Sequence, residues 1–71
     1  MKLELDFSSS KSIYLQIEDN LIKAIAKGDL KIGESLPSVR SMAEDIGVNL
    51  HTVNKAYNEL KDRGYLNIDR R

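Results

Sequence analysis

Two short amphipathic segments separated by a glycine turn constrain the fold of this chain more than any other feature. Within each segment the apolar residues recur at the spacing that places them on one face of an α-helix. These positions are Val39, Met42, Ala43 and Ile46 in the first segment and Val53, Ala56, Tyr57 and Leu60 in the second. Two short helices that each bury one face and are joined by a tight turn form a helix-turn-helix.

Both segments also carry signals for where a helix begins and ends. Ser38 and Asn49 stand just before the two stripes, and their side chains can accept a hydrogen bond from a free backbone N–H of the first turn. Gly47 and Gly64 follow the stripes, where a left-handed residue commonly ends a helix. We therefore predict a helix-turn-helix over about residues 38–63.

The flanking segments predict one further helix and little else. Residues 1–11 form an N-terminal arm in which Leu3, Leu5 and Phe7 alternate with polar residues, the pattern of a short edge strand or of an extended arm. A helix follows, ends near Gly28 and is apolar on two faces. Its predicted core face is Ile13, Tyr14, Ile17, Leu21, Ala24 and Ile25, and its second apolar face is Leu15, Ile22 and Ala26.

The end of the chain predicts the start of a wing. After Gly64, residues 65–68 have the composition of a short strand, and the chain ends at residue 71 before any second strand of a hairpin. We therefore predict one domain over residues 1–71, mainly α with short β. It would be a winged helix-turn-helix of three helices with a small, truncated wing that starts in residues 65–71.

Composition excludes several classes of function. The chain has no cysteine and one histidine, so it lacks the residues for a disulfide or a thiolate metal site, and we predict no metal, no cofactor and no enzymatic activity. No apolar run approaches the roughly 18 residues of a membrane span, and residues 1–6 alternate apolar with charged residues, unlike a signal peptide. We expect a cytoplasmic domain without a membrane partner.

The net charge leaves two classes of binding partner open. Eleven basic and eleven acidic residues cancel, whereas a nucleic-acid-binding domain is expected to carry a basic excess. A winged-helix domain used for protein interaction would suit this balance. The face that carries the charges matters more than their sum, however, because a few basic side chains near phosphates act locally.

Five stretches of the chain, in their order, resemble a known family. They are residues 13–17 (IYLQI), 28–40 (GDLKIGESLPSVR), 42–49 (MAEDIGVN), 52–57 (TVNKAY) and 60–66 (LKDRGYL). From Ser12 to Ile68 the sequence resembles the winged-helix DNA-binding domain of GntR-family bacterial transcription regulators, particularly the YtrA-like branch. This resemblance implies a repressor or activator that binds a palindromic operator in double-stranded DNA as a homodimer.

The resemblance also implies a part beyond this chain. Family members carry a C-terminal segment for effector binding or dimerisation. The chain is either the DNA-binding part of a longer regulator, which we expect, or a natural minimal protein. A fusion to an aminotransferase-like domain stays open. Two features depart from the family. Leu50 stands where many members place an arginine that reads guanine, and the chain stops before the Gly-rich turn of the wing.

The candidate DNA-binding residues gather at the starts of the two helices and at the C-terminus. They are Ser38, Arg40, Asn49, Leu50, His51, Thr52, Asn54, Lys55, Asn58, Arg70 and Arg71. The resemblance assigns six of them to DNA: Arg40, Asn49, Leu50, His51, Thr52 and Asn54. Asparagine can bond an adenine edge, lysine can reach guanine or phosphate, and threonine can touch phosphate or a thymine methyl group.

Each candidate has a plainer alternative. The polar stripe of the second helix would equally suit an ordinary solvent-exposed face with no binding role. Arg40 has Glu44 four residues ahead, at the spacing of an exposed ion pair. Arg70 and Arg71 suit a wing that enters a minor groove, and they equally suit a frayed terminus.

Overall fold

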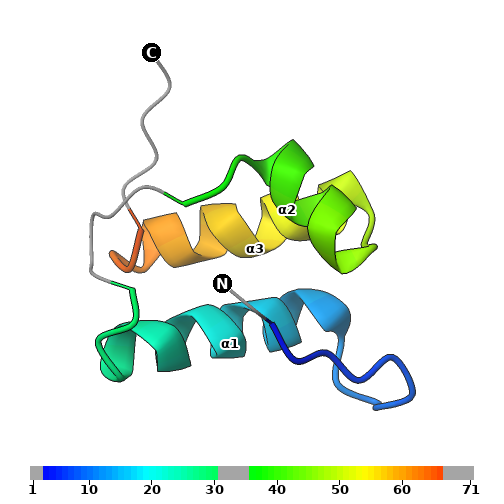
Figure 1. Cartoon of the computed structure of the whole chain (residues 1–71), viewed down its shortest axis with the longest axis horizontal. Coiled ribbons are helices and arrows are strands. Elements are labelled where there is room, and N and C mark those ends of the chain that lie inside the picture. Colours follow the sequence, from blue (N-terminus) through cyan, green and yellow to red (C-terminus); the bar gives the residue numbers. More distant parts are fainter. Residues whose placement is uncertain (1–2, 31–35, 67–71) are drawn as a thin grey trace.

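The computed structural model describes residues 3–30 and 36–66. Three helices follow one another in these residues: α1 (Ile13–Ala26), α2 (Val39–Ile46) and α3 (Leu50–Asp62). In Figure 1, α1 and α3 lie side by side and run in the same direction, and α2 lies against the first part of α3. Because α3 packs against both other helices, it is the central element of the domain.

The apolar stripes predicted from the sequence meet in one core. Its buried members are Ile17, Leu21, Leu30, Met42, Ala43, Val53, Ala56, Tyr57, Leu60 and Leu66. Val39 and Ile46, the outer members of the first stripe, are partly buried against this core. Burying side chains as large as Ile17 and Leu21, which are 0% exposed, stabilises the fold by about 1.5–3 kcal/mol each.

The predicted helix ends are confirmed by the local hydrogen bonds. Ser38 precedes α2 and its hydroxyl accepts from the backbone N–H of Ser41 at 3.0 Å. Asn49 precedes α3 and its side-chain oxygen accepts from the N–H of His51 at 2.7 Å. Gly47 adopts φ +67°, a left-handed conformation that is costly for other residues, so it can turn the chain sharply between α2 and α3.

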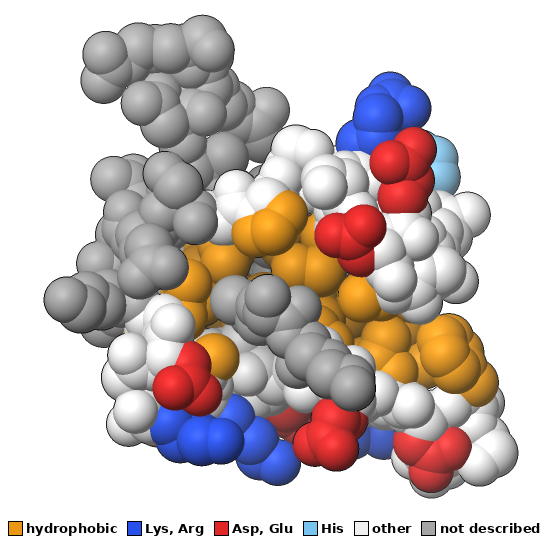
Figure 2. Space-filling view, viewed as in Figure 1, with side chains coloured by type: hydrophobic (Ala, Val, Ile, Leu, Met, Phe, Trp, Pro, Cys, Tyr) orange, Lys and Arg blue, Asp and Glu red, His pale blue; other side chains and the backbone are white. Residues whose placement is uncertain are grey.

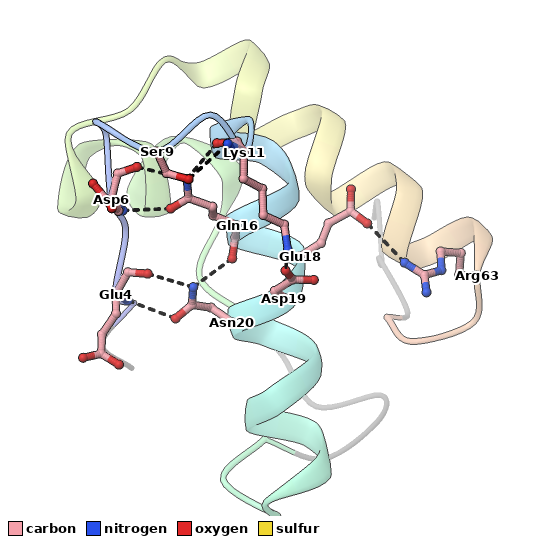
Figure 3. A network of polar contacts seen from close by, with 9 residues as sticks. All are labelled: Glu4, Asp6, Ser9, Lys11, Gln16, Glu18, Asp19, Asn20 and Arg63. Atoms are coloured by element: carbon pink, nitrogen blue, oxygen red, sulfur yellow. Dashed lines mark hydrogen bonds and ion pairs between the residues drawn. The ribbon is translucent and has the colours of Figure 1, made fainter.

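The N-terminal segment is an extended arm tied to α1 (Figure 3). The backbone N–H and C=O of Glu4 bond the side-chain amide of Asn20 at 2.9 and 3.0 Å, and those of Asp6 bond the amide of Gln16 at 2.8 and 3.0 Å. Each amide both accepts and donates, so two side chains spaced four residues apart on α1 replace the neighbouring strand of a sheet.

Of the two alternatives predicted for residues 1–11, a short edge strand or an extended arm, this arrangement is the extended arm. Residues 3–30 and 36–66 contain no strand. The alternation in the arm has another cause, since Leu3 and Leu5 pack against the core while the backbone between them bonds to α1. Residues 67–71, where the wing was predicted to continue, lie outside the described residues.

The second apolar face predicted for α1 is only partly free. Ile22 is half buried and packs against the core, which removes it from that face. Leu15 is 38% exposed, and Ala26 is also exposed. On the arm, Phe7 is 65% exposed because the chain has turned away from the core by that point.

Candidate nucleic-acid interface

The first half of α3 presents polar side chains on the side opposite the core. His51, Asn54 and Lys55 are exposed, and Thr52 and Asn58 are half buried. The apolar stripe of the same helix is fully buried, which fixes the rotation of α3 about its own axis. The polar side is therefore held in one orientation by packing.

The two residues that open α3 differ in chemistry. The side-chain oxygen of Asn49 is occupied by the cap bond to His51, while its amide nitrogen keeps two donors for another acceptor. Leu50, the first residue of the helix, is 39% exposed. The start of α3 therefore offers hydrogen-bond donors and one apolar side chain close together in the sequence.

The start of α2 forms the second part of the candidate interface. The Ser38 hydroxyl accepts a cap bond, so its own hydrogen remains able to donate. Arg40 lies in the first turn of α2 and is exposed, and within the described residues it forms no ion pair with Glu44. Free backbone N–H groups, a hydroxyl and a guanidinium group thus occur together at one helix start, an arrangement suited to an anion.

A buried tyrosine ties these two parts together. The hydroxyl of Tyr57 on α3 donates to the carbonyl oxygen of Pro37, just before α2, at 2.8 Å. Burial raises the pKa of Tyr57 to about 12, so the hydroxyl keeps its proton and this bond at neutral pH. The start of α2 is therefore anchored to the middle of α3.

In Figure 2 a histidine (pale blue) and a basic side chain (blue) lie at the same edge of the molecule, above a band of apolar side chains that runs between the helices. Acidic side chains lie close to them in this view, which agrees with the neutral net charge of the chain. The surface around α2 and the start of α3 is thus of mixed charge, and any attraction of phosphate depends on individual side chains.

A row of polar residues along the α1–α3 contact was not predicted from the sequence. We call it the polar row, and its members are Tyr14 and Glu18 on α1 and Lys55, Glu59 and Arg63 on α3. The Lys55 ammonium lies 3.4 Å from a Glu59 carboxylate oxygen and 4.6 Å from the centre of the Tyr14 ring. Arg63 lies 3.3 Å from Glu18 (Figure 3). Lys55 is therefore already engaged within the domain, unlike the other candidates on α3.

The spacing of these residues is the signal that the sequence contained. Members of the polar row recur every four residues on each helix, which is the spacing of neighbours on a helical face. Because α1 and α3 run in the same direction, Tyr14 pairs with Lys55, and Glu18, one turn further along α1, pairs with Arg63, two turns further along α3. Which polar residues of α1 meet which residues of α3 depends on the relative direction of the two helices, which the sequence does not give.

Glu18 is the unusual member of the polar row. It is 2% exposed, and its second carboxylate oxygen has no hydrogen-bond partner. Burial first, and then the neighbouring Glu59 carboxylate, raise the pKa of Glu18 to about 7, while Arg63 opposes the rise. The pKa of Glu59 is lowered, chiefly by its hydrogen bond with Glu18. Below about pH 7 the Glu18 carboxyl therefore holds its proton, which it can donate toward Glu59.

Neither a metal site nor a membrane-spanning helix is found among the described residues. In residues 3–30 and 36–66 no group of three or more His, Cys, Asp or Glu side chains could hold a metal ion. Among the same residues no helix has the length and apolar character needed to cross a membrane. Arg70 and Arg71, which were predicted as wing residues, lie outside the described part of the chain.

Comparison with known proteins decides the family. Residues 13–71 match the family model described as bacterial regulatory proteins, gntR family. The chain belongs to the GntR family. The three helices described above are those of the winged helix-turn-helix DNA-binding domain found in these bacterial transcription regulators, as the resemblance implied.

Individual relatives of this GntR domain agree with that assignment. The transcriptional repressor YtrA of Bacillus subtilis is 42% identical over 64 residues, which are 90% of this chain and 49% of the repressor. The uncharacterised regulator YhcF of the same organism is 38% identical over 68 residues, which are 96% of this chain and 56% of YhcF. The chain thus spans about half the length of these curated relatives.

A solved structure supports the same conclusion. The GntR-family transcription factor YtrA from Sulfolobus acidocaldarius superposes on 97% of this GntR domain with a TM-score of 0.91 and 49% sequence identity. The match covers 73% of that chain. The fold predicted from the sequence is therefore confirmed at the level of the winged helix-turn-helix.

Proposed function

We propose that this domain recognises operator DNA by placing the first two turns of α3 in the major groove and the start of α2 on the phosphate backbone. The observation that carries this proposal is the exposed polar side of α3, held opposite a fully buried stripe. In helix-turn-helix proteins the second helix enters the major groove and its N-terminal residues touch the base edges.

The base-reading residues in this proposal are those with amide, imidazole or hydroxyl groups. Asn54 is exposed one turn into α3 and can give two hydrogen bonds to adenine. His51, exposed at the start of the helix, donates or accepts in the groove. Thr52 and Asn58, both half buried, border this group, and Asn49 adds the two amide donors that its cap bond leaves free.

The phosphate contacts fall to the start of α2. Arg40 is exposed and pairs with no acid on its own helix, and Ser38 has a hydroxyl hydrogen to donate. Lys55 contributes least, because a phosphate would have to replace its contacts with Glu59 and Tyr14. We propose that Arg70 and Arg71, as part of the wing, contact the minor groove.

Zero net charge implies that one domain binds DNA weakly, so we propose that the regulator acts as a homodimer on a palindrome. Two linked domains place their recognition helices in successive major grooves, about 34 Å apart. Linkage makes the second contact intramolecular and raises affinity by roughly 10²–10⁴. The dimer would form through a segment beyond residues 1–71. The regulator would act as a repressor without enzymatic activity, in the bacterial cytoplasm where the chromosome lies.

The second candidate function is a protein-interaction module. Its support is the neutral charge and the mixed surface around α2 in Figure 2. A surface that binds proteins is usually richer in aromatic and apolar residues at its centre. The start of α3 instead presents an imidazole and side-chain amides beside a single leucine, which favours DNA.

Selection from random duplexes tests the proposal. The protein and its Asn54→Ala and His51→Ala variants are each used to enrich bound duplexes, and the motifs and affinities are compared. Loss of a bidentate base contact should cost about 1–3 kcal/mol and relax the preference at one base position. Asp45→Ala, a change of an exposed residue on the last turn of α2, is the control and should leave the motif unchanged. An unchanged motif and affinity for both α3 variants would refute the proposal.

A further inference from the structure

The first residue of α3 is a large apolar side chain that the core does not use. Among the described residues, three large hydrophobic side chains are classed as exposed: Phe7 on the arm, Leu15 on α1 and Leu50 on α3. Leu50 is 39% exposed, although the other apolar residues Val53, Ala56 and Leu60 of α3 are fully buried. Its apolar surface is therefore available to whatever lies against the start of α3.

The position of Leu50 limits the groups that it can contact. It lies between Asn49, whose side chain caps the helix, and His51, whose backbone N–H receives that cap bond. The cap fixes the conformation of the first turn, so the Leu50 side chain is held at the end of α3 that the proposed function places in the major groove.

In that groove the base edges offer one apolar group. Guanine, cytosine and adenine present only hydrogen-bond donors and acceptors there, whereas thymine also presents its C5 methyl group. A leucine side chain cannot bond the polar edges, and covering them without a partner costs free energy. The favourable partner for Leu50 is therefore a methyl group on a pyrimidine.

We propose that Leu50 is a specificity-determining residue that contacts the methyl group of a thymine, so that each half-site contains an A·T pair at a fixed position. This inference rests on the proposed function, since it requires the start of α3 to lie in the major groove. It adds the chemical identity of one base and the group by which that base is read.

Replacing thymine by deoxyuridine tests the contact, because it removes only the methyl group. Each thymine of the selected operator is replaced in turn, and the affinity of the protein is measured for every duplex. Replacement at one position should weaken binding about fourfold, because the burial of one methyl group is lost there. In the Leu50→Ala variant the thymine and uracil operators should bind equally at that position.

Two controls separate this contact from other effects. Leu15→Ala removes a leucine of matched exposure, 38%, on α1 and should keep the full sensitivity to uracil. A C·G pair at the same position should bind the protein more tightly once its cytosine is methylated at C5, and Leu50→Ala should not show this gain. Circular dichroism verifies that both variants keep the helices.

The outcomes distinguish this inference from the proposed function. If the protein binds a specific operator but no thymine responds to uracil, or if Leu50→Ala keeps the full response, the role of Leu50 is refuted and DNA recognition by α3 stands. If no specific duplex is enriched, or if the His51 and Asn54 variants select the same motif with the same affinity, the proposed function fails and the Leu50 contact fails with it.

Discussion

Replacing the buried carboxyl group of Glu18 by an amide should stabilise this domain at neutral and alkaline pH. Glu18 is 2% exposed, one of its oxygens has no partner when it is ionised, and the Glu59 carboxylate lies beside it. A glutamine has the same shape and no charge, and its amide N–H can donate to Glu59 as the protonated Glu18 does. Glu18→Gln therefore keeps the favourable hydrogen bond at every pH.

The size of the effect follows from the pKa of Glu18. Its ordinary value of 4.5 rises to about 7 in the folded domain, so the folded state binds more protons than the unfolded state between these two values. The free energy of unfolding must then fall as the pH rises through this window, and each pKa unit corresponds to about 1.4 kcal/mol. The total is at most about 3 kcal/mol between pH 4 and pH 8.

Urea unfolding at a series of pH values measures this contribution. Glu18→Gln should match the unaltered protein near pH 4 and exceed its free energy of unfolding by up to about 3 kcal/mol at pH 8. Glu44→Gln, a change of an exposed acid on α2, should leave the pH profile as it was. A variant that is less stable than the unaltered protein at pH 8, or that keeps the same pH slope, would refute this explanation of the polar row.

Three further changes test other parts of the structure. Arg40→Ala should weaken binding to all duplexes alike and reduce the slope of log K against log salt by about 1, and a changed base preference with an unchanged slope would show that Arg40 reads bases. Tyr57→Phe, which removes the 2.8 Å bond to Pro37, should lower the free energy of unfolding by about 0.5–1.5 kcal/mol in thermal unfolding, whereas an unchanged stability would contradict the anchoring role. Gly47→Ala should cost about 1–2 kcal/mol for its left-handed backbone alone, because a Cβ there meets no atom within 4 Å, and a neutral result would show that the turn relaxes.

The helix-turn-helix could be predicted from the sequence because its signals are local. Cap residues act within one turn, so Ser38 and Asn49 identify the helix starts without knowledge of the rest of the fold. The buried stripes follow from helical periodicity for the same reason. The helix that became α1 was predicted from the same periodicity, and resemblance to the GntR family added the expected function.

Features that depend on how distant segments meet could not be predicted in the same way. A period of two is common to a strand and to an arm, and only the amides of Gln16 and Asn20 decide between them. The engagement of Lys55 with Tyr14, and the burial of Glu18, depend on the parallel alignment of α1 and α3. The predicted contacts of individual residues with DNA stay predictions, since they concern a partner and not the fold.

Backbone amide shifts in a nuclear magnetic resonance titration with the selected operator test the central claim most directly. If α3 enters the major groove and the start of α2 meets phosphate, the largest shifts should fall on residues 38–40 and 49–54. The outer side of α1, which carries Asp19 and Lys23, should shift little. The largest shifts on the arm or on α1, with residues 49–54 unchanged, would contradict DNA recognition through α3.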